Sequence, residues 1–169
     1  MDPTPIELWL KSTSLAALMN TAWAWPVAES IHFIGLSLLI GTVGIFDLRL
    51  IGFAKWIPLS ALHRLIPFGI CGFVLNILTG ISFFTAFPDQ YLYNPSFQLK
   101  MVFIMLAGVN VLLFYSTMFR QVKLRAAGED APLPARFMGL ASLVFWIGVM
   151  SAGRLITFFR PPIISCPWC

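Results

Sequence analysis

The sequence predicts an all-α integral membrane protein, an up-down four-helix bundle preceded by a short interfacial helix. Hydrophobic residues fill 59% of its 169 positions and charged residues only 11%, whereas about a quarter of a typical soluble domain is charged. Four apolar runs follow one another, at residues 25–46, 66–87, 97–119 and 137–159. Each has about 20 residues or slightly more, enough to cross about 30 Å of hydrocarbon as a helix. The short connections between the runs make neighbouring helices antiparallel.

Residues 5–20 form the predicted interfacial helix. Thr4 and Glu7 have the spacing of a capping box, and Pro5 suits the first helical position. The residues that follow are mildly amphipathic, which favours a helix on the outer membrane surface. A helical extension of the first span is the alternative.

The first span begins near residue 25, where Trp23 and Trp25 are typical of a membrane interface. No basic segment directly precedes it, and it is longer than the apolar core of a cleavable signal peptide. The polar connections between the runs are short. We therefore expect residues 1–169 to form a single membrane domain surrounded by lipid.

The basic residues predict the orientation of the bundle. Seven of them lie in or beside the first and third connections, namely Arg49, Lys55, Arg64, Arg120, Lys123, Arg125 and Arg136. The other four lie elsewhere, so the positive-inside rule assigns these two connections to the cytoplasm. We therefore expect a bacterial inner-membrane protein with both termini in the periplasm. The net charge of +4 follows from this topology, and we find no nucleic-acid-binding signature.

Ionisable residues collect near the predicted outer ends of the spans. Glu29 and His32 lie on the first span, Lys100 opens the third, and Arg154 and Arg160 follow near the end of the fourth. Because ionisable groups are costly to bury in a membrane, this group is a candidate functional site. The alternative is structural. The cations would then extend to the lipid headgroups, Glu29 would pair with one of them, and His32 would be a neutral, hydrogen-bonded residue.

The candidate site has the residue types that bind haem b. Histidine is a common axial ligand of haem iron, and arginine or lysine can neutralise the propionates. His32 would bind the iron, with Lys100, Arg154 and Arg160 as propionate or quinone partners. Gly35 would leave space for the macrocycle on the same helix face.

Three further features bear on this haem hypothesis. Glu29 could orient the His32 imidazole by a hydrogen bond. His63 lies roughly 25 Å from His32 along the membrane normal, which is too far to share one iron. The sixth ligand would then be weak, absent, supplied by a partner subunit, or a methionine such as Met101 or Met105.

The C-terminal segment contains Cys166 and Cys169 in a C-x-x-C pattern. In an oxidising compartment such a pair can form a disulfide, exchange thiols or bind a soft metal such as Cu(I). The sequence leaves these alternatives open.

Several motifs resemble those of a family of small, functionally uncharacterised bacterial four-helix membrane proteins. They are H-F-I-G-L-S-L-L-I-G from His32, D-L-R-L-I-G from Asp47 and F-Q-L-K ending at Lys100, and the resemblance spans about residues 25–120. More distantly, a histidine on the first core helix and a lysine opening a later helix are similar to two groups. These are the membrane-bound, haem-containing protoporphyrinogen oxidases and the copper-resistance D-type proteins. The similarity to the oxidases implies that His32 is the haem ligand and that Lys100 is the matching lysine.

Three functional hypotheses follow. The first is a haem-b-binding membrane subunit that passes electrons between a periplasmic partner and the quinone pool. It would work with a partner redox subunit or as a homo-oligomer. The second is a non-catalytic membrane subunit or small transporter, in which Glu29, His32, Lys100 and Arg154 form a buried polar network. The third is periplasmic copper handling by His32 and the cysteine pair.

Overall fold

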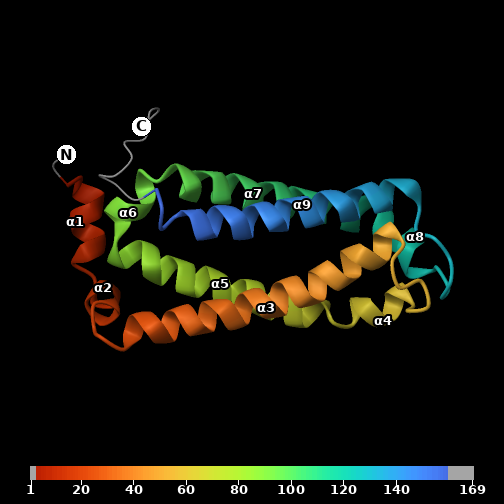
Figure 1. The fold of residues 1–169 in the computed structure, drawn as a ribbon, viewed down its shortest axis with the longest axis horizontal. Coiled ribbons are helices and arrows are strands. Elements are labelled where there is room, and N and C mark those ends of the chain that lie inside the picture. Colours follow the sequence, from red (N-terminus) through yellow and green to blue (C-terminus); the bar gives the residue numbers. More distant parts are fainter. Residues whose placement is uncertain (1–2, 160–169) are drawn as a thin grey trace.

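The computed structural model describes residues 3–159, which are helical throughout apart from turns and loops, with no strand in that range. Four helical segments are long and apolar enough to cross a membrane: Ala24–Ile51, Leu59–Ala86, Pro95–Lys123 and Leu133–Leu155. They confirm the predicted all-α fold with four candidate spans (Figure 1). The chain is therefore a multi-pass membrane protein.

The spans are built from the following helices. They are α3 (Ala24–Ile51), α4 (Leu59–His63) with α5 (Ile66–Ala86), α7 (Pro95–Leu113) with the π-helix η1 (Phe114–Met118) and α8 (Phe119–Lys123), and α9 (Leu133–Leu155). The first span continues five residues beyond the predicted end at residue 46, through Asp47 and Arg49, to Gly52 in the left-handed conformation. Glycine adopts that conformation readily, so Gly52 ends the helix.

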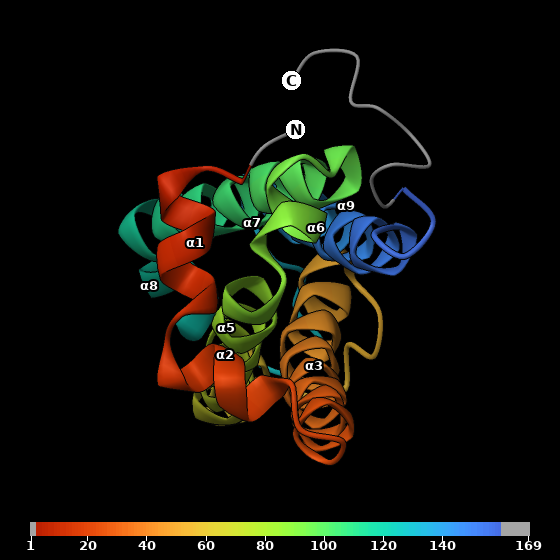
Figure 2. The same cartoon turned by 90° about the vertical axis from the view of Figure 1, so that its left-hand side faces the viewer.

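The predicted interfacial helix is divided into α1 (Pro5–Lys11) and α2 (Ser14–Met19). The capping box of Thr4 and Glu7 is present at the start of α1. Thr13 interrupts the segment because its side chain caps a new helix, accepting a hydrogen bond from the amide of Ala16 at 3.3 Å. Figure 2 shows α1 and α2 lying across one end of the bundle. We call this the amino-terminal end, and the opposite end, with the connections after α3 and α8, the basic-loop end.

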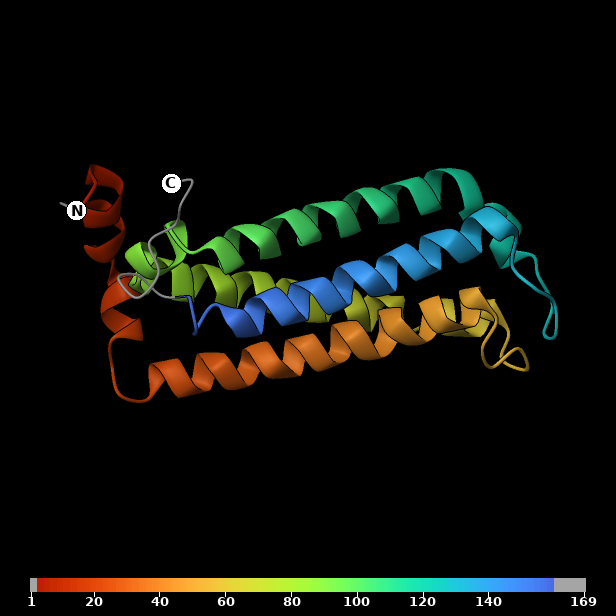
Figure 3. The same cartoon turned by 45° about the horizontal axis from the view of Figure 1, so that its top comes forward.

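The four spans form two closely packed pairs, α3 with α5 and α7 with α9. The pairs meet where α3 packs against α9, whereas the backbones of α5 and α7 stay apart (Figures 1 and 3) and these two helices meet through the stacked rings of Phe84 and Phe97, with centroids 5.9 Å apart. Gly72 on α5 allows the first close approach, since a Cβ there would collide with the Gly35 carbonyl and lie 2.8 Å from the Leu39 amide nitrogen. Gly148 on α9 allows the second, because the Phe103 ring occupies the place of its missing side chain.

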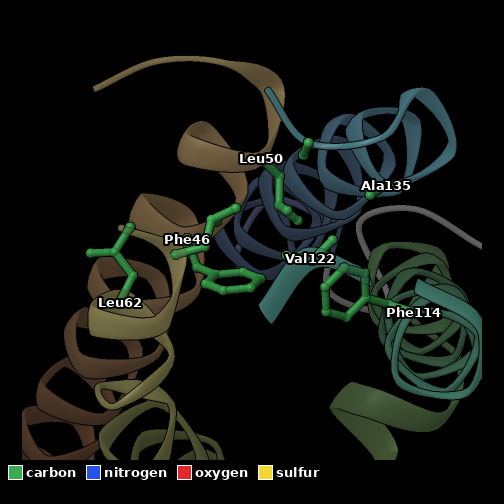
Figure 4. Close-up of a cluster of buried hydrophobic side chains, with 8 residues drawn as sticks. Phe46, Leu50, Leu62, Phe114, Val122 and Ala135 are labelled. Carbon is green, nitrogen blue, oxygen red and sulfur yellow. The ribbon is translucent and has the colours of Figure 1, made fainter. Parts of the chain in front are cut away.

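A hydrophobic cluster closes the basic-loop end. Figure 4 shows Phe46 and Leu50 of α3 beside Phe114 of the π-helix and Val122 of α8. The rings of Phe46 and Phe114 meet edge to face with centroids 5.8 Å apart. This cluster brings α3, α4, α8 and α9 together although α5 and α7 remain apart.

Arg49 ties the loops at this end to the bundle. Its side chain is only 1% exposed, and its guanidinium donates to three backbone carbonyls. The distances are 2.7 Å to Ile57, 3.1 Å to Lys55 and 3.1 Å to Glu129. The first two belong to the connection after α3 and the third to the connection before α9. Arg49 thereby supplies hydrogen-bond donors to both connections, and the Gly128 amide donates to the Lys55 carbonyl as well, at 2.8 Å.

Candidate functional site

His32 is half-buried on α3 and contacts the facing helix α5. Its Nδ1 lies 2.7 Å from Oγ1 of Thr79, and the same hydroxyl donates to the Leu75 carbonyl at 2.7 Å. A threonine hydroxyl has one proton, and when that proton is donated to the Leu75 carbonyl the oxygen accepts a hydrogen bond from His32 Nδ1–H. In the neutral imidazole, the lone pair then resides on Nε2, where it can accept a proton, a hydrogen bond or a metal ion.

Lys100 is the second member of this site. Its half-buried side chain extends from α7 along Gly153 of α9, with Nζ 3.7 Å from the place of a Cβ on that glycine. Its ammonium group interacts electrostatically with His32. Within residues 3–159, no carboxylate forms an ion pair with Lys100 and no group accepts a hydrogen bond from it. Lys100 thus interacts with His32 and has no acid paired with it among residues 3–159.

The remaining ionisable residues do not join this pair. Glu29 is exposed on α3, and Thr79, not Glu29, is the hydrogen-bond partner that orients His32. Arg154 is also exposed, and its guanidinium lies over the Phe158 ring, 5.8 Å from the centroid. Arg160 lies outside the described residues, as do Cys166 and Cys169. Of the predicted group, the structure therefore brings His32 and Lys100 together.

Gly35 has a different role from the predicted one. A Cβ on Gly35 would lie 2.7 Å from Asn76 Nδ2 and 2.8 Å from the Gly72 carbonyl oxygen. The space beside it is therefore filled by α5 and is not available to a macrocycle. Met101 and Met105 are 42% and 67% exposed, so neither turns toward the bundle interior as a ligand for the same iron would.

His63 lies at the opposite end of the bundle from His32. Its Nε2 is 3.1 Å from the Tyr115 hydroxyl, and its ring packs against Phe119 with centroids 4.7 Å apart. His32, in contrast, contacts Phe83 near the amino-terminal end. The two histidines do not share a site, as the helical rise along the sequence predicts.

A second group of polar side chains lies nearer the basic-loop end. Asp47 of α3 is only 5% exposed and interacts with the Ser142 hydroxyl of α9. Asn110 of α7 donates from Nδ2 to the Met138 carbonyl at 3.0 Å. These residues and Trp146 line a cavity of about 290 Å³ between the four spans.

Sequence analysis missed Asp47 as a member of this group because the apolar run appeared to end at residue 46. Asp47 and Arg49 were therefore interpreted as charged residues at the membrane edge. Their spacing could have separated their roles, since residues two apart on a helix point to different sides. Asp47 lines the cavity and Arg49 binds the loops. Within residues 3–159, no three His, Cys, Asp or Glu side chains are grouped to hold a metal ion.

A family of unknown function, DUF6644, matches residues 21–159. The chain belongs to this family. The DUF6644 match begins after α2 and includes all four spans, so His32, Lys100, Asp47 and Trp146 all lie in the part that defines the family. It confirms the resemblance to a functionally uncharacterised family. The sequence matches no curated protein and no solved structure.

Proposed function

We propose that the protein is a haem-b-binding membrane subunit that passes electrons between a periplasmic partner and membrane quinone. The observation that carries this proposal is the hydrogen bond from His32 Nδ1–H to Thr79. It fixes the imidazole orientation and leaves Nε2 as the free ligand atom. Metal-bound histidines commonly donate their other ring N–H in this way.

Lys100 gives the proposal its second support. An ammonium group among apolar side chains, with no acid beside it in the described part of the chain, is costly to keep charged. A haem propionate would supply the missing carboxylate. His32 and Lys100 would thus hold the group, and haem would supply a one-electron redox couple when bound.

The number of axial ligands that this chain can supply follows from the side chains near His32. Met101 and Met105 of α7 are exposed and do not face the bundle interior. We therefore expect this chain to provide one axial ligand, with the other position weakly bound or filled by a partner subunit.

Visible spectroscopy tests the proposal on full-length protein purified in mild detergent after expression with added haem. We expect a Soret band and, in the dithionite-reduced minus air-oxidised spectrum, the α band of a b-type haem. His32→Ala should remove both, whereas His63→Ala, which changes the other histidine, should retain them. A Soret band that survives in His32→Ala at full occupancy would overturn the assignment.

The second polar group favours one alternative function. Asp47, Ser142 and Asn110 extend polarity toward the middle of the bundle, beside a cavity. A small transporter or non-catalytic subunit would use such a network with no haem. A flat visible spectrum from haem-supplemented, folded protein would select this alternative.

A further inference from the structure

The cavity near the basic-loop end has an apolar lining and an opening toward lipid. Its volume is about 290 Å³, close to the lower end of the range of about 300–1,000 Å³ for small-molecule sites. The side chains of Phe46, Phe73, Phe114 and Trp146 contribute aromatic surface. The cavity lies where α5 and α7 fail to meet, and its lining includes side chains exposed on the outside of the bundle, namely Ile70, Val111 and Tyr115. A lipophilic molecule could therefore enter from the bilayer.

Two buried polar atoms at this cavity have no hydrogen-bond partner. They are Oδ2 of Asp47 and Nε1 of Trp146, on side chains that are 5% and 9% exposed. Unpaired polar atoms are rare in protein interiors and especially costly in a membrane, where water does not replace the missing partner. Asp47 and Trp146 come from different helices, α3 and α9, and both line the same space.

The chemistry of the two atoms limits the class of ligand. An indole nitrogen only donates, and a carboxylate oxygen accepts. The lining contains no Lys, Arg or His, so it has no charge to attract an anion. A lipophilic cation would pair with Asp47 but leave Trp146 unpaired. An uncharged ring with both hydroxyl and ether or carbonyl oxygens could satisfy both.

We infer that this cavity binds the ring of a membrane quinol or quinone, with Asp47 and Trp146 as its hydrogen-bonding residues. The quinol hydroxyl donates to the Asp47 carboxylate, and a ring oxygen accepts from the Trp146 indole. The isoprenoid tail leaves between α5 and α7 into lipid. Both polar atoms are covered by neighbouring atoms in this structure, so a small side-chain rotation accompanies binding.

The π-helix η1 strengthens the inference. Phe114 and Tyr115 lie in η1 and line the cavity, and π-helical turns within α-helices occur frequently at functional sites. The inferred site would be the place where the proposed electron-transfer subunit binds quinone. The inference rests on the proposed function, because haem would be the electron donor or acceptor for that quinone. The inferred site does not require His32, which lies toward the other end of the bundle.

The test is a thermal-stability titration of full-length protein in mild detergent with the short-chain analogue decylubiquinone, oxidised and reduced. A ligand that binds only the folded protein raises the melting temperature, and the rise grows with ligand concentration. Binding at one specific site gives a rise that follows a saturation curve. We expect a saturable rise for the natural sequence. Asp47→Leu and Trp146→Phe should each weaken the apparent affinity about tenfold or more, the loss of about 1.4 kcal/mol.

Matched controls separate a specific site from general partitioning. Glu29→Gln changes an exposed carboxylate on the same helix, and Trp9→Phe changes an exposed indole. Both should titrate like the natural sequence. Asp47→Leu removes a buried carboxylate that forms no ion pair among residues 3–159, together with its interaction with Ser142. The melting temperature without quinone verifies that each variant folds.

His32→Ala distinguishes failure of this inference from failure of the haem proposal, since it should lose haem and still bind decylubiquinone. The inference would be overturned by an equal rise in all variants or by no rise in the natural sequence. A larger, Asp47-dependent rise with the lipophilic cation tetraphenylphosphonium would overturn it as well and assign the cavity to organic cations.

Discussion

His32 and Thr79 join the first and second spans through one hydrogen bond of 2.7 Å between Nδ1 and Oγ1. When the hydroxyl donates its one proton to the carbonyl of Leu75, one turn earlier on α5, it accepts from His32 Nδ1–H. This contact then fixes both the position and the tautomer of the imidazole. The orientation of the His32 imidazole is therefore set by the protein itself, without a ligand.

Replacing Thr79 should cost more than replacing a similar threonine without a partner on another helix. Thr85 is also buried and donates to the carbonyl four residues earlier, at 2.8 Å. We expect Thr79→Val to reduce the free energy of unfolding by about 1 kcal/mol more than Thr85→Val, because it leaves His32 Nδ1–H unpaired. Unfolding of both variants in mixed detergent micelles, followed by circular dichroism, measures the difference. Equal losses would show that the interhelical bond contributes nothing to stability.

The contact between α3 and α5 should tolerate no methyl group at Gly72. A Cβ there meets backbone atoms of Gly35 and Leu39, which cannot rotate away. Overpacking of this kind costs typically about 1–3 kcal/mol. Gly80→Ala on the same helix is the control, since a Cβ at Gly80 has no atom within 4 Å. We expect Gly72→Ala to lower the melting temperature by several degrees and Gly80→Ala to leave it unchanged or raise it.

Arg49 should be among the residues most sensitive to substitution at the basic-loop end. Arg49→Met removes the donor from three carbonyls, each of which costs about 1–3 kcal/mol if it remains buried and unpaired. The Lys55 carbonyl keeps the Gly128 amide as a donor at 2.8 Å, so two carbonyls, those of Ile57 and Glu129, lose their donor. We expect a loss of about 2 kcal/mol or more and faster proteolysis of the two connections. Arg64→Met, at an exposed position, should behave like the natural sequence. Unchanged proteolysis in Arg49→Met would contradict this role.

The ion pair between Lys55 and Asp130 should be visible in a pH titration. The Lys55 ammonium lies 2.7 Å from Asp130 Oδ1, and its hydrogen bond holds the pKa of Asp130 below the usual value for aspartate. A lowered pKa in the folded state stabilises the fold at pH values above the unfolded pKa. That stability is lost as the pH falls through the folded pKa. Carboxyl-carbon NMR should show the Asp130 pKa rising in Lys55→Ala but not in Lys123→Ala.

The helical bundle could be predicted from the sequence because span length, proline positions and the capping box of Thr4 and Glu7 are local properties. Relative position along the helices was also predictable, since it follows from a rise of about 1.5 Å per residue. This explains why His32 and His63 were expected at opposite ends of the bundle.

Which side chains face the interior could not be predicted in the same way. Residues three apart differ by about 60° around a helix, enough to expose Glu29 while His32 reaches Thr79. The facing direction depends on where α5 and α9 lie, and these positions result from packing across the whole bundle. Asp47 was missed for a related reason, because hydropathy alone does not reveal that loops and aromatic side chains cover a charged residue.

The bond between Arg49 and the Glu129 carbonyl joins residues 80 positions apart. During synthesis, Arg49 therefore reaches the membrane well before its last partner exists. In the orientation that the basic residues predict, it would at that stage be a hydrated cation that helps to retain the first connection on the side where synthesis occurs. Only after the third span has been inserted can the same guanidinium bind the Glu129 carbonyl. One residue would thus act first in orienting the chain and later in holding the finished bundle together.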